Sequence, residues 1–354
     1  MSKRGPKRFP GLAWALSATL TLPSLVGACR RKVSGEMGAS ASATSAGQVA
    51  GAGDLAEHRL RTADGRERRY LAGAAPVGAG SGRPLLLVLH GGGGSAEGTV
   101  ETTFTPEAAR AHGFVVAYPQ GLSERVLGKD MATWNTGRCC GKAAAEGVDD
   151  VSFLAAVVDD LATAQGIDRR RVFATGISNG AMMAMRLACE RPDLVAGISA
   201  VGGPGYTGEC AAPRPVAVQL VHGTADPCAL YGGGAECGGC WERASAALGV
   251  KLPERHFSCE SVAEQAAFWR RVNGCADEAR SSYTRGAARC VEYTACASGK
   301  PVSVCTIEGG GHTWPGGVRG CDERSRLCRA FADATGPISA DLDASATMAA
   351  FFLR

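Results

Sequence analysis

Continuous apolar runs that end in turn residues predict the strands of a buried sheet. Three runs are largely apolar and do not alternate with polar positions: residues 84–90, residues 114–118 and the run that follows Arg171. Such runs are typical of parallel strands covered on both faces. Later runs of the same character lie at 194–201, 216–222 and 302–308. Residues 58–62 and 66–72, which are split by Asp64-Gly65, predict a β-hairpin instead.

Apolar positions at helical spacing alternate with these strands. Val151, Leu154, Val158 and Leu161 recur with helical spacing, and Gly166 marks the helix end. Further helices are expected at 106–112, 261–272 and about 340–353, and directly after Ser178. This alternation over roughly 300 residues predicts one α/β domain, residues 54–354, with a mostly parallel central sheet flanked by helices.

Two segments lack this regularity. Residues 119–148 are expected to form a long loop that contains Trp134 and the vicinal pair Cys139-Cys140, and loops of that length usually carry function. Residues 227–260 hold four cysteines and show little periodicity, which predicts an excursion held by disulfides.

The N-terminus has the composition of an export signal. Basic side chains at 3–8 precede an apolar run, 12–26, which is too short and too interrupted by Pro23 to span a bilayer. We therefore expect residues 1–28 to be a signal peptide of the lipoprotein type, with Cys29 as the lipidated residue because Leu25-Val-Gly-Ala-Cys29 resembles a bacterial lipobox. Ordinary cleavage near 39–43 is the alternative.

Beyond this leader the composition is that of an exported, electrically neutral protein. Residues 29–53 are rich in Ala, Ser and Gly and are expected to form a flexible tether. The formal charge of +4 comes entirely from Lys3, Arg4, Lys7 and Arg8, and the balanced remainder argues against nucleic acid or an anionic membrane face as the partner. Any membrane contact is expected only through a lipid on Cys29, at the bacterial cell envelope; otherwise the protein would be extracellular.

The cysteine count supports export independently. Of 15 cysteines, 14 remain after removal or lipidation of Cys29, and such a number fits an oxidising compartment. Cys237-Gly-Gly-Cys240 could be half of a zinc site or a redox pair. Without a second such pair at zinc-finger spacing or a nearby histidine cluster, structural disulfides are the better interpretation, and no metal is expected.

One stretch has the form of a nucleophile elbow. Gly176-Ile-Ser178-Asn-Gly180 follows a predicted strand and opens a predicted helix, and the two glycines allow the tight turn that exposes the serine hydroxyl. Asp226 and His312 each follow a later predicted strand, so that nucleophile, acid and base appear in the order of an α/β-hydrolase triad. The glycines after His90 could supply one oxyanion N–H, and the N–H of Asn179 would be the second donor.

Several of these assignments have competitors. Asp149, Asp150 or Asp160 could be the acid, although helix capping is the favoured role for the first two. His90 and His222 are alternative bases, but each ends a buried strand and better fits a structural role. Trp314 and, more weakly, Trp134 and Tyr118 are candidates for contact with substrate, and core packing is the alternative for each.

With these motifs the chain resembles the secreted poly(3-hydroxybutyrate) depolymerase and feruloyl esterase family of α/β-hydrolases. The resemblance covers about residues 54–353 and is carried by the following motifs: Leu-His-Gly-Gly-Gly-Gly at 89–94, Trp134-Asn135 with Cys139-Cys140-Gly141, Val-Asp-Asp-Val at 148–151, Gly-Ile-Ser-Asn-Gly, Leu-Ala-Cys-Glu at 187–190 and Gly-Gly-Gly-His-Thr-Trp-Pro-Gly-Gly at 309–317. It implies a triad of Ser178, Asp226 and His312 and oxyanion N–H groups from Gly92 and Asn179. Two features depart from the family pattern: Gly92 stands where depolymerases often have cysteine, and the cysteine-rich insertion after Asp226 is long.

These observations together predict an exported serine carboxylesterase, monomeric and without a cofactor, that works through an acyl-enzyme. The expected substrates are feruloyl or acetyl esters of plant polysaccharide, polymeric or oligomeric. A polyhydroxyalkanoate depolymerase is the alternative. No appended polymer-binding domain is expected, and this weakens the case for a crystalline polymer substrate. A surface lipoprotein that only binds is the alternative of another class. We also expect Cys139 or Cys140 to pair with Cys189, because this bond would hold the long loop beside the site.

Overall fold

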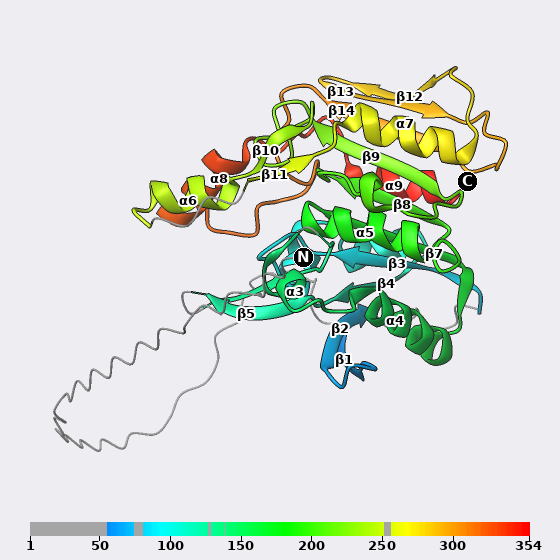
Figure 1. The fold of residues 1–354 in the computed structure, drawn as a ribbon, viewed down its shortest axis with the longest axis horizontal. Helices are drawn as coiled ribbons and strands as arrows, with labels where there is room; N and C mark the ends of the chain where they lie inside the picture. The colour runs from blue at the N-terminus through cyan, green and yellow to red at the C-terminus, as the bar shows by residue number, and fades with distance from the viewer. Residues whose placement is uncertain (1–54, 74–80, 127–128, 138, 251–255) are drawn as a thin grey trace, which may run out of the picture. The chain divides into compact units, whose positions relative to one another are not determined.

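A ten-stranded sheet forms the centre of the protein in the computed structural model, which describes residues 55–73, 81–126, 129–137, 139–250 and 256–354. The predicted signal peptide, the tether and Cys29 lie outside the described residues. The strand order is β1-β2-β4-β3-β7-β8-β9-β14-β13-β12 (Figure 1). All pairings from β4 to β14 are parallel, whereas the strands added at both edges are antiparallel, so the predicted mostly parallel sheet is confirmed. The strands are β1 (Leu55–Arg61), β2 (Glu67–Gly73), β3 (Arg83–Leu89), β4 (Val115–Pro119), β7 (Ile167–Ile177), β8 (Gly197–Val201), β9 (Ala217–Gly223), β12 (Arg280–Arg285), β13 (Ala288–Tyr293) and β14 (Val302–Ile307).

Helices cover both faces of this sheet. Along β3, Leu85, Leu87 and Leu89 belong to one buried cluster and Leu86 and Val88 to a second, because successive strand side chains point to opposite faces. The first cluster includes residues of α4 (Asp150–Gln165), α5 (Asn179–Glu190) and α7 (Val262–Asn273). The second includes residues of α1 (Ala96–Thr102), α2 (Pro106–Ala111) and α9 (Ala344–Phe352). The uninterrupted apolar runs of the central strands follow from this double coverage.

The ends of the helices follow local capping chemistry. Asp149 caps α4, as predicted, by accepting a hydrogen bond from the N–H of Ser152 at 2.9 Å, and Gly166 ends this helix in the left-handed conformation. In α7, the side chains of Ser261 and Glu264 form a reciprocal capping box.

Two segments are more regular than the sequence suggested. The predicted loop 119–148 contains a hairpin of β5 (Leu122–Val126) and β6 (Lys129–Thr133) and the short helix α3 (Gly141–Ala145). The cysteine-rich excursion contains β10 (Gly234–Gly238), α6 (Cys240–Ala247) and β11 (His256–Cys259). Helix α8 (Arg326–Thr335), which was not predicted, contacts α6 through the rings of Trp241 and Phe331, 5.5 Å apart.

Fourteen cysteines form seven disulfides, which confirms the structural interpretation of the cysteines. Cys139 bonds to its neighbour Cys140, and Cys189 bonds to Cys210, so the predicted bond between the long loop and Cys189 is wrong. The remaining pairs are 228–240, 237–259, 275–296, 290–305 and 321–328. Cys189 lies near the end of α5, and Cys210 follows the short turn of residues 207–209 after β8, so the bond joins two segments on either side of β8 in the chain.

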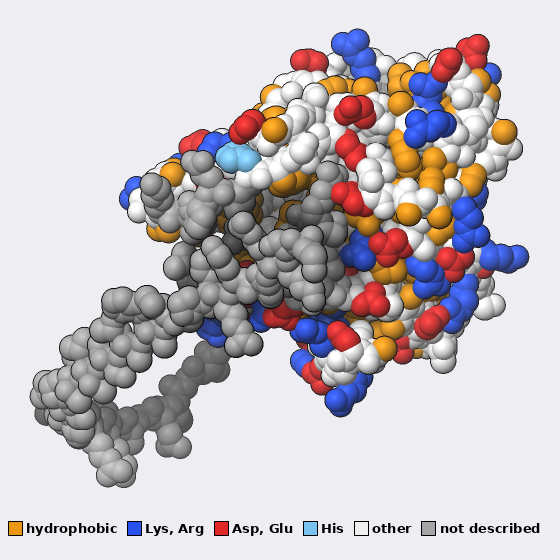
Figure 2. All heavy atoms as spheres, in the orientation of Figure 1, with side chains coloured by type: hydrophobic (Ala, Val, Ile, Leu, Met, Phe, Trp, Pro, Cys, Tyr) orange, Lys and Arg blue, Asp and Glu red, His pale blue; other side chains and the backbone are white. Residues whose placement is uncertain are grey.

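The surface carries charges of both signs. On the face in Figure 2, basic and acidic side chains are interspersed over the described residues, as the balanced sequence predicts. No helix among the described residues combines the length and the apolar character needed to cross a membrane.

Candidate active site

Ser178 lies at a sharp turn between β7 and α5. Its φ of 57° and ψ of −119° place it in a region that non-glycine residues rarely adopt. A Cβ on Gly176 would come within 2.6 Å of the backbone carbon of Gly180, and one on Gly180 within 2.3 Å of the carbonyl oxygen of Leu89. Both glycines are therefore required for the close approach of β3, β7 and α5 that forms the predicted elbow.

Asp226 and His312 meet at the same edge of the sheet. Asp226 follows β9 and His312 follows β14, so both lie at the carboxyl ends of parallel strands, as Ser178 does after β7. Nδ1 of His312 is 2.7 Å from Oδ2 of Asp226, which fits a hydrogen bond from the ring N–H to the carboxylate. The structure thus joins the acid and the base that the sequence predicted.

A short segment after β8 links this pair to Ser178. The N–H of Ser178 donates to the carbonyl of Val201 at 2.9 Å. The next residue, Gly202, packs against the pair, since a Cβ there would lie 3.1 Å from Nδ1 of His312 and 3.2 Å from Oδ2 of Asp226. With a φ of +55°, Gly202 also needs to be glycine.

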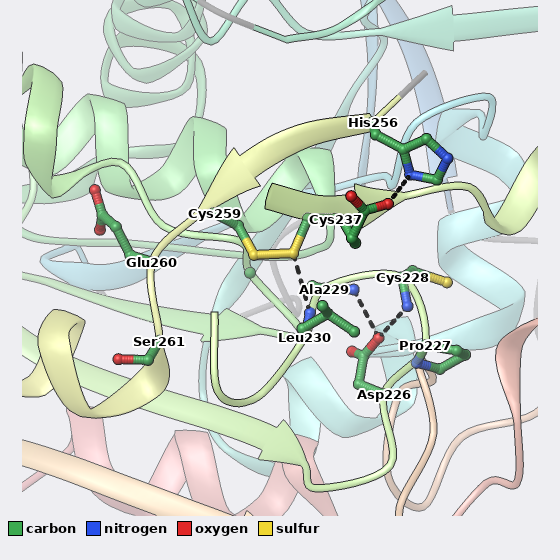
Figure 3. Close-up of a disulfide and its surroundings, with 12 residues drawn as sticks. Asp226, Pro227, Cys228, Ala229, Leu230, Cys237, His256, Cys259, Glu260 and Ser261 are labelled. Carbon is green, nitrogen blue, oxygen red and sulfur yellow. Dashed lines mark hydrogen bonds and ion pairs between the residues drawn. A yellow bond between two sulfur atoms is a disulfide. The ribbon is translucent and has the colours of Figure 1, made fainter. Parts of the chain in front are cut away.

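The Asp226 carboxylate is buried and held from several sides. Its Oδ1 accepts hydrogen bonds from the N–H groups of Cys228 and Ala229, both at 2.8 Å (Figure 3). Burial raises the pKa of Asp226, but the attraction of His312 and the hydrogen bonds from His222 and His312 outweigh it and bring the pKa well below its ordinary value. Asp226 is therefore ionised and aligned over the whole neutral and mildly acidic range.

His222 supports this arrangement from the other side. Its Nε2 lies 2.7 Å from the carbonyl oxygen of Ala229 and 3.4 Å from Oδ2 of Asp226. One N–H of His222 is thus shared between the backbone and Asp226, and this engagement fits the structural role that the sequence favoured over that of base.

The glycine loop after β3 lies against the elbow. A Cβ on Gly91 would be 3.7 Å from Cβ of Ser178, and one on Gly92 would be 3.6 Å from Cβ of Asn179. The N–H of Gly93 donates to Ala132 and that of Gly94 to Gly91, whereas the N–H of Gly92 has no hydrogen-bond partner among the described residues. Gly92 and the first N–H of α5, that of Asn179, are thus the donors available beside Ser178.

The side chain of Asn179 ties the elbow to the long loop. Its Oδ1 accepts from the backbone N–H of Trp134 at 2.8 Å, and its Nδ2 donates to the carbonyl of Trp134 at 3.1 Å. The next residue, Asn135, donates its N–H to Asp150 at 2.8 Å, and Asp150 forms a buried ion pair with Arg68 at 2.7 Å. These contacts fix the loop against α5. The sequence did not reveal that Arg68 and Asp150 help to hold the loop, because the two residues are distant in the chain.

Neither tryptophan predicted to contact substrate reaches the surface. Trp134 has no exposed area, stacks on His90 and donates its indole N–H to the carbonyl of that residue at 3.0 Å. Trp314 is 4% exposed and donates to Oγ of Ser345 at 3.1 Å. Both fill the core, as does Tyr118, whose hydroxyl donates to the carbonyl of Phe104; buried aromatic N–H and O–H groups usually find such partners.

The competing acids have other partners. Asp149 caps α4, Asp150 pairs with Arg68, and Asp160 accepts a hydrogen bond from the hydroxyl of Tyr70.

Three side chains at the site have the spacing of metal ligands. Asp226, Cys228 and His312 offer ligand atoms within 4.8 Å of one another, but the sulfur of Cys228 is bonded to Cys240 and unavailable to a metal ion. The geometry therefore fits an acid–base pair.

His90 is locked in one neutral form. Its Nδ1 faces the carbonyl oxygen of Gly91 at 2.8 Å, and its Nε2 accepts from the N–H of Gly121 at 2.9 Å, so the proton lies on Nδ1. Complete burial lowers the pKa of His90 from 6.5 to about 4. His90 is therefore a structural histidine, as the sequence favoured, and not a base.

We expect the free energy of unfolding to fall as the pH drops from 6.5 towards 4. In this range the unfolded chain binds a proton at His90 and the folded chain does not. The contribution of the neutral His90 ring to the free energy of unfolding is therefore complete above pH 6.5 and falls by about 3 kcal/mol by pH 4. Urea unfolding of the wild type, His90→Gln and the exposed control His256→Gln between pH 7 and 4 tests this. A pH slope that is the same in all three proteins would contradict the assignment.

The chain is similar to several known ester hydrolases. Residues 77–235 match the family model described as Phospholipase/Carboxylesterase. The chain is 37% identical over 265 residues to a protein named "Putative esterase NocK" of Nocardia uniformis subsp. tsuyamanensis, and the match covers 72% of each protein. It is 28% identical to Feruloyl esterase B of Piromyces equi, over 68% of this chain and 41% of that protein. It is also 29% identical to Poly(3-hydroxyalkanoate) depolymerase C of Paucimonas lemoignei, over 37% of this chain and 30% of that protein.

Proposed function

The chain belongs to the α/β-hydrolase family of carboxylic ester hydrolases that includes feruloyl esterases and poly(3-hydroxyalkanoate) depolymerases, and from this we propose that Ser178, His312 and Asp226 act as its catalytic triad. The observation that carries the proposal is the 2.7 Å contact between His312 and a buried, ionised Asp226, at the same sheet edge as the elbow serine. The competing acids and bases all have structural partners.

In this mechanism the hydroxyl oxygen of Ser178 attacks the carbonyl carbon of the ester while Nε2 of His312 takes the hydroxyl proton. Asp226 accepts the hydrogen bond from Nδ1–H, keeps the ring in the required tautomer and stabilises the imidazolium. As the carbon–oxygen bond breaks, His312 returns the proton to the leaving alcohol. Water then attacks the acyl-enzyme, again with His312 as the base, and releases the acid and free Ser178.

The negative oxygen of each tetrahedral intermediate is stabilised by the N–H groups of Gly92 and Asn179. Preformed donors of this kind need no reorganisation during the reaction. The bidentate contact between the Asn179 side chain and the backbone of Trp134 holds one donor in place. The second donor, Gly92, lies next to Asn179, since a Cβ on Gly92 would be 3.6 Å from Cβ of Asn179.

The substrates proposed are feruloyl or acetyl esters of plant polysaccharide. The similarity to Feruloyl esterase B over 68% of the chain supports this class. A polyhydroxyalkanoate depolymerase is the second candidate, supported by the 29% identity to a depolymerase over 37% of the chain. We also propose export, with residues 1–28 as the signal peptide and Cys29 as the lipidation site, which the seven disulfides support.

A comparison of two products separates the candidate substrates. We expect the purified protein to release ferulate from methyl ferulate faster than it releases 3-hydroxybutyrate from amorphous poly(3-hydroxybutyrate). The opposite preference would assign the depolymerase function. A fluorophosphonate probe that labels the wild type but not Ser178→Ala would exclude a protein that only binds, whereas equal labelling of both would refute Ser178 as the nucleophile.

A further inference from the structure

We propose that Trp241, on α6, contacts the substrate and selects esters whose acyl group is a planar aromatic ring. This inference rests on the proposed ester hydrolase function and names one determinant of its substrate preference. Trp241 belongs to the cysteine-rich excursion, whose length departs from the family pattern, and not to any of the shared motifs.

The indole of Trp241 lies directly against the glycine loop. A Cβ on Gly93 would come within 2.8 Å of Cζ2 of Trp241 and within 2.7 Å of the terminal methyl of Met131. Gly93 is the residue after the proposed oxyanion donor Gly92, and Gly91 lies close enough to Ser178 that a Cβ on it would be 3.7 Å from Cβ of Ser178. Since consecutive Cα atoms are about 3.8 Å apart, Gly91 and Gly93 are separated by at most about 7.5 Å, which is within the length of a hydroxycinnamoyl group.

The ring is accessible although it is held in position. Trp241 is 42% exposed, whereas Trp134, Trp269 and Trp314 are buried. Its ring also contacts the half-buried Phe331 of α8, with centroids 5.5 Å apart and an interplanar angle of 44°. Trp241, Phe331 and Met131, from three separate elements, thus form an apolar wall beside the oxyanion loop, which we call the aromatic wall.

Both helices of this wall are attached to the loops that carry the acid and the base. Cys240, next to Trp241, is bonded to Cys228, and the N–H of Cys228 donates to Asp226. Figure 3 shows the backbone nitrogens of Cys228 and Ala229 both directed at the Asp226 carboxylate. At the end of α8, the carbonyl of Thr335 accepts from the N–H of His312 at 2.6 Å. The wall is therefore fixed relative to the triad and can act as a rigid binding surface.

An aromatic acyl group suits this surface better than a short aliphatic one. Aromatic rings gain energy from offset or edge-to-face contacts beyond the burial of apolar area. An acyl carbonyl bound at Gly92 and Asn179 could direct a ring attached through a short, stiff linker along Gly93 to the indole. An acetyl group ends before it reaches Trp241.

The test compares two esters that differ only in the acyl group, methyl ferulate and methyl acetate. We expect Trp241→Ala to lower the ratio of kcat/KM for methyl ferulate to that for methyl acetate about tenfold, and Trp241→Phe to restore most of it. Leu327→Ala, which removes a 48% exposed leucine on α8, is the matched control and should leave the ratio unchanged. An unchanged ratio in Trp241→Ala, or an equal loss on both esters, would overturn the proposal.

A binding measurement separates this inference from the proposed function. We expect Ser178→Ala to bind ferulate about tenfold more tightly than Ser178→Ala/Trp241→Ala in calorimetric titration. If the wild type cleaved neither ester but this difference persisted, the hydrolase proposal would fail and the aromatic contact would stand. Hydrolysis of both esters with equal ferulate affinities would reject the contact alone.

Discussion

Replacing Ser178 with alanine is expected to lower kcat/KM for ester hydrolysis by about 10⁴-fold or more, because the acyl-enzyme cannot form without the hydroxyl. The fold should persist, since the Ser178 side chain makes no capping hydrogen bond to α5 and alanine has the same backbone restrictions. Turnover of p-nitrophenyl acetate, together with thermal unfolding, measures both effects.

The exposed Ser152 on α4 provides a matched control for this substitution. Ser152→Ala should retain full activity because only its backbone N–H has a structural role, at the Asp149 cap. Substantial turnover by a correctly folded Ser178→Ala protein would assign the nucleophile elsewhere and remove the basis of the proposed mechanism.

Replacing Asp226 with asparagine is expected to lower kcat by about 10⁴-fold at neutral pH. The N–H groups of Cys228 and Ala229 would hold the asparagine Oδ1, so its amide nitrogen would face His312. An amide N–H in this position donates to Nδ1 and forces the ring proton onto Nε2, where it blocks proton transfer from Ser178. The loss is measured from activity as a function of pH. It should be much smaller at high pH, where hydroxide can take the serine proton in place of His312.

Asp160→Asn is the corresponding control, because Asp160 was a competing candidate for the acid and bonds to Tyr70 instead. Its kcat should stay within about twofold of the wild type, since surface substitutions away from a site have small effects. If Asp160→Asn lost as much activity as Asp226→Asn, the acid would have to be reassigned.

The elbow and its partners were predictable because they depend on chain order and strand ends. Gly176 and Gly180 flank the serine in sequence, and Asp226 and His312 each follow an apolar run, so the parallel sheet brings them to one edge. The sheet itself was predictable for the same reason, since its central strands are continuous apolar runs.

Features that depend on contacts between distant segments were not predictable. The partner of Cys189 is set by how β8 and α5 pack, and the sequence cannot show that Cys210 lies nearer than Cys139 or Cys140. The burial of Trp134 and Trp314 has the same origin: each indole N–H bonds to a residue distant in the chain. Conversely, only the packing of α6 on α8 and the glycine loop places Trp241 beside the site.

The bond between Cys228 and Cys240 has a practical consequence for making this protein in a recombinant host. The two bonded cysteines are 12 residues apart in the chain: Cys228, whose N–H donates to the Asp226 carboxylate, and Cys240, which precedes Trp241. In a reducing cytoplasm this bond would not be maintained, and the loop that carries Asp226 would lose its covalent attachment to α6. Expression in an oxidising compartment, with a thiol titration of the product, is therefore the appropriate starting point for every kinetic comparison described above.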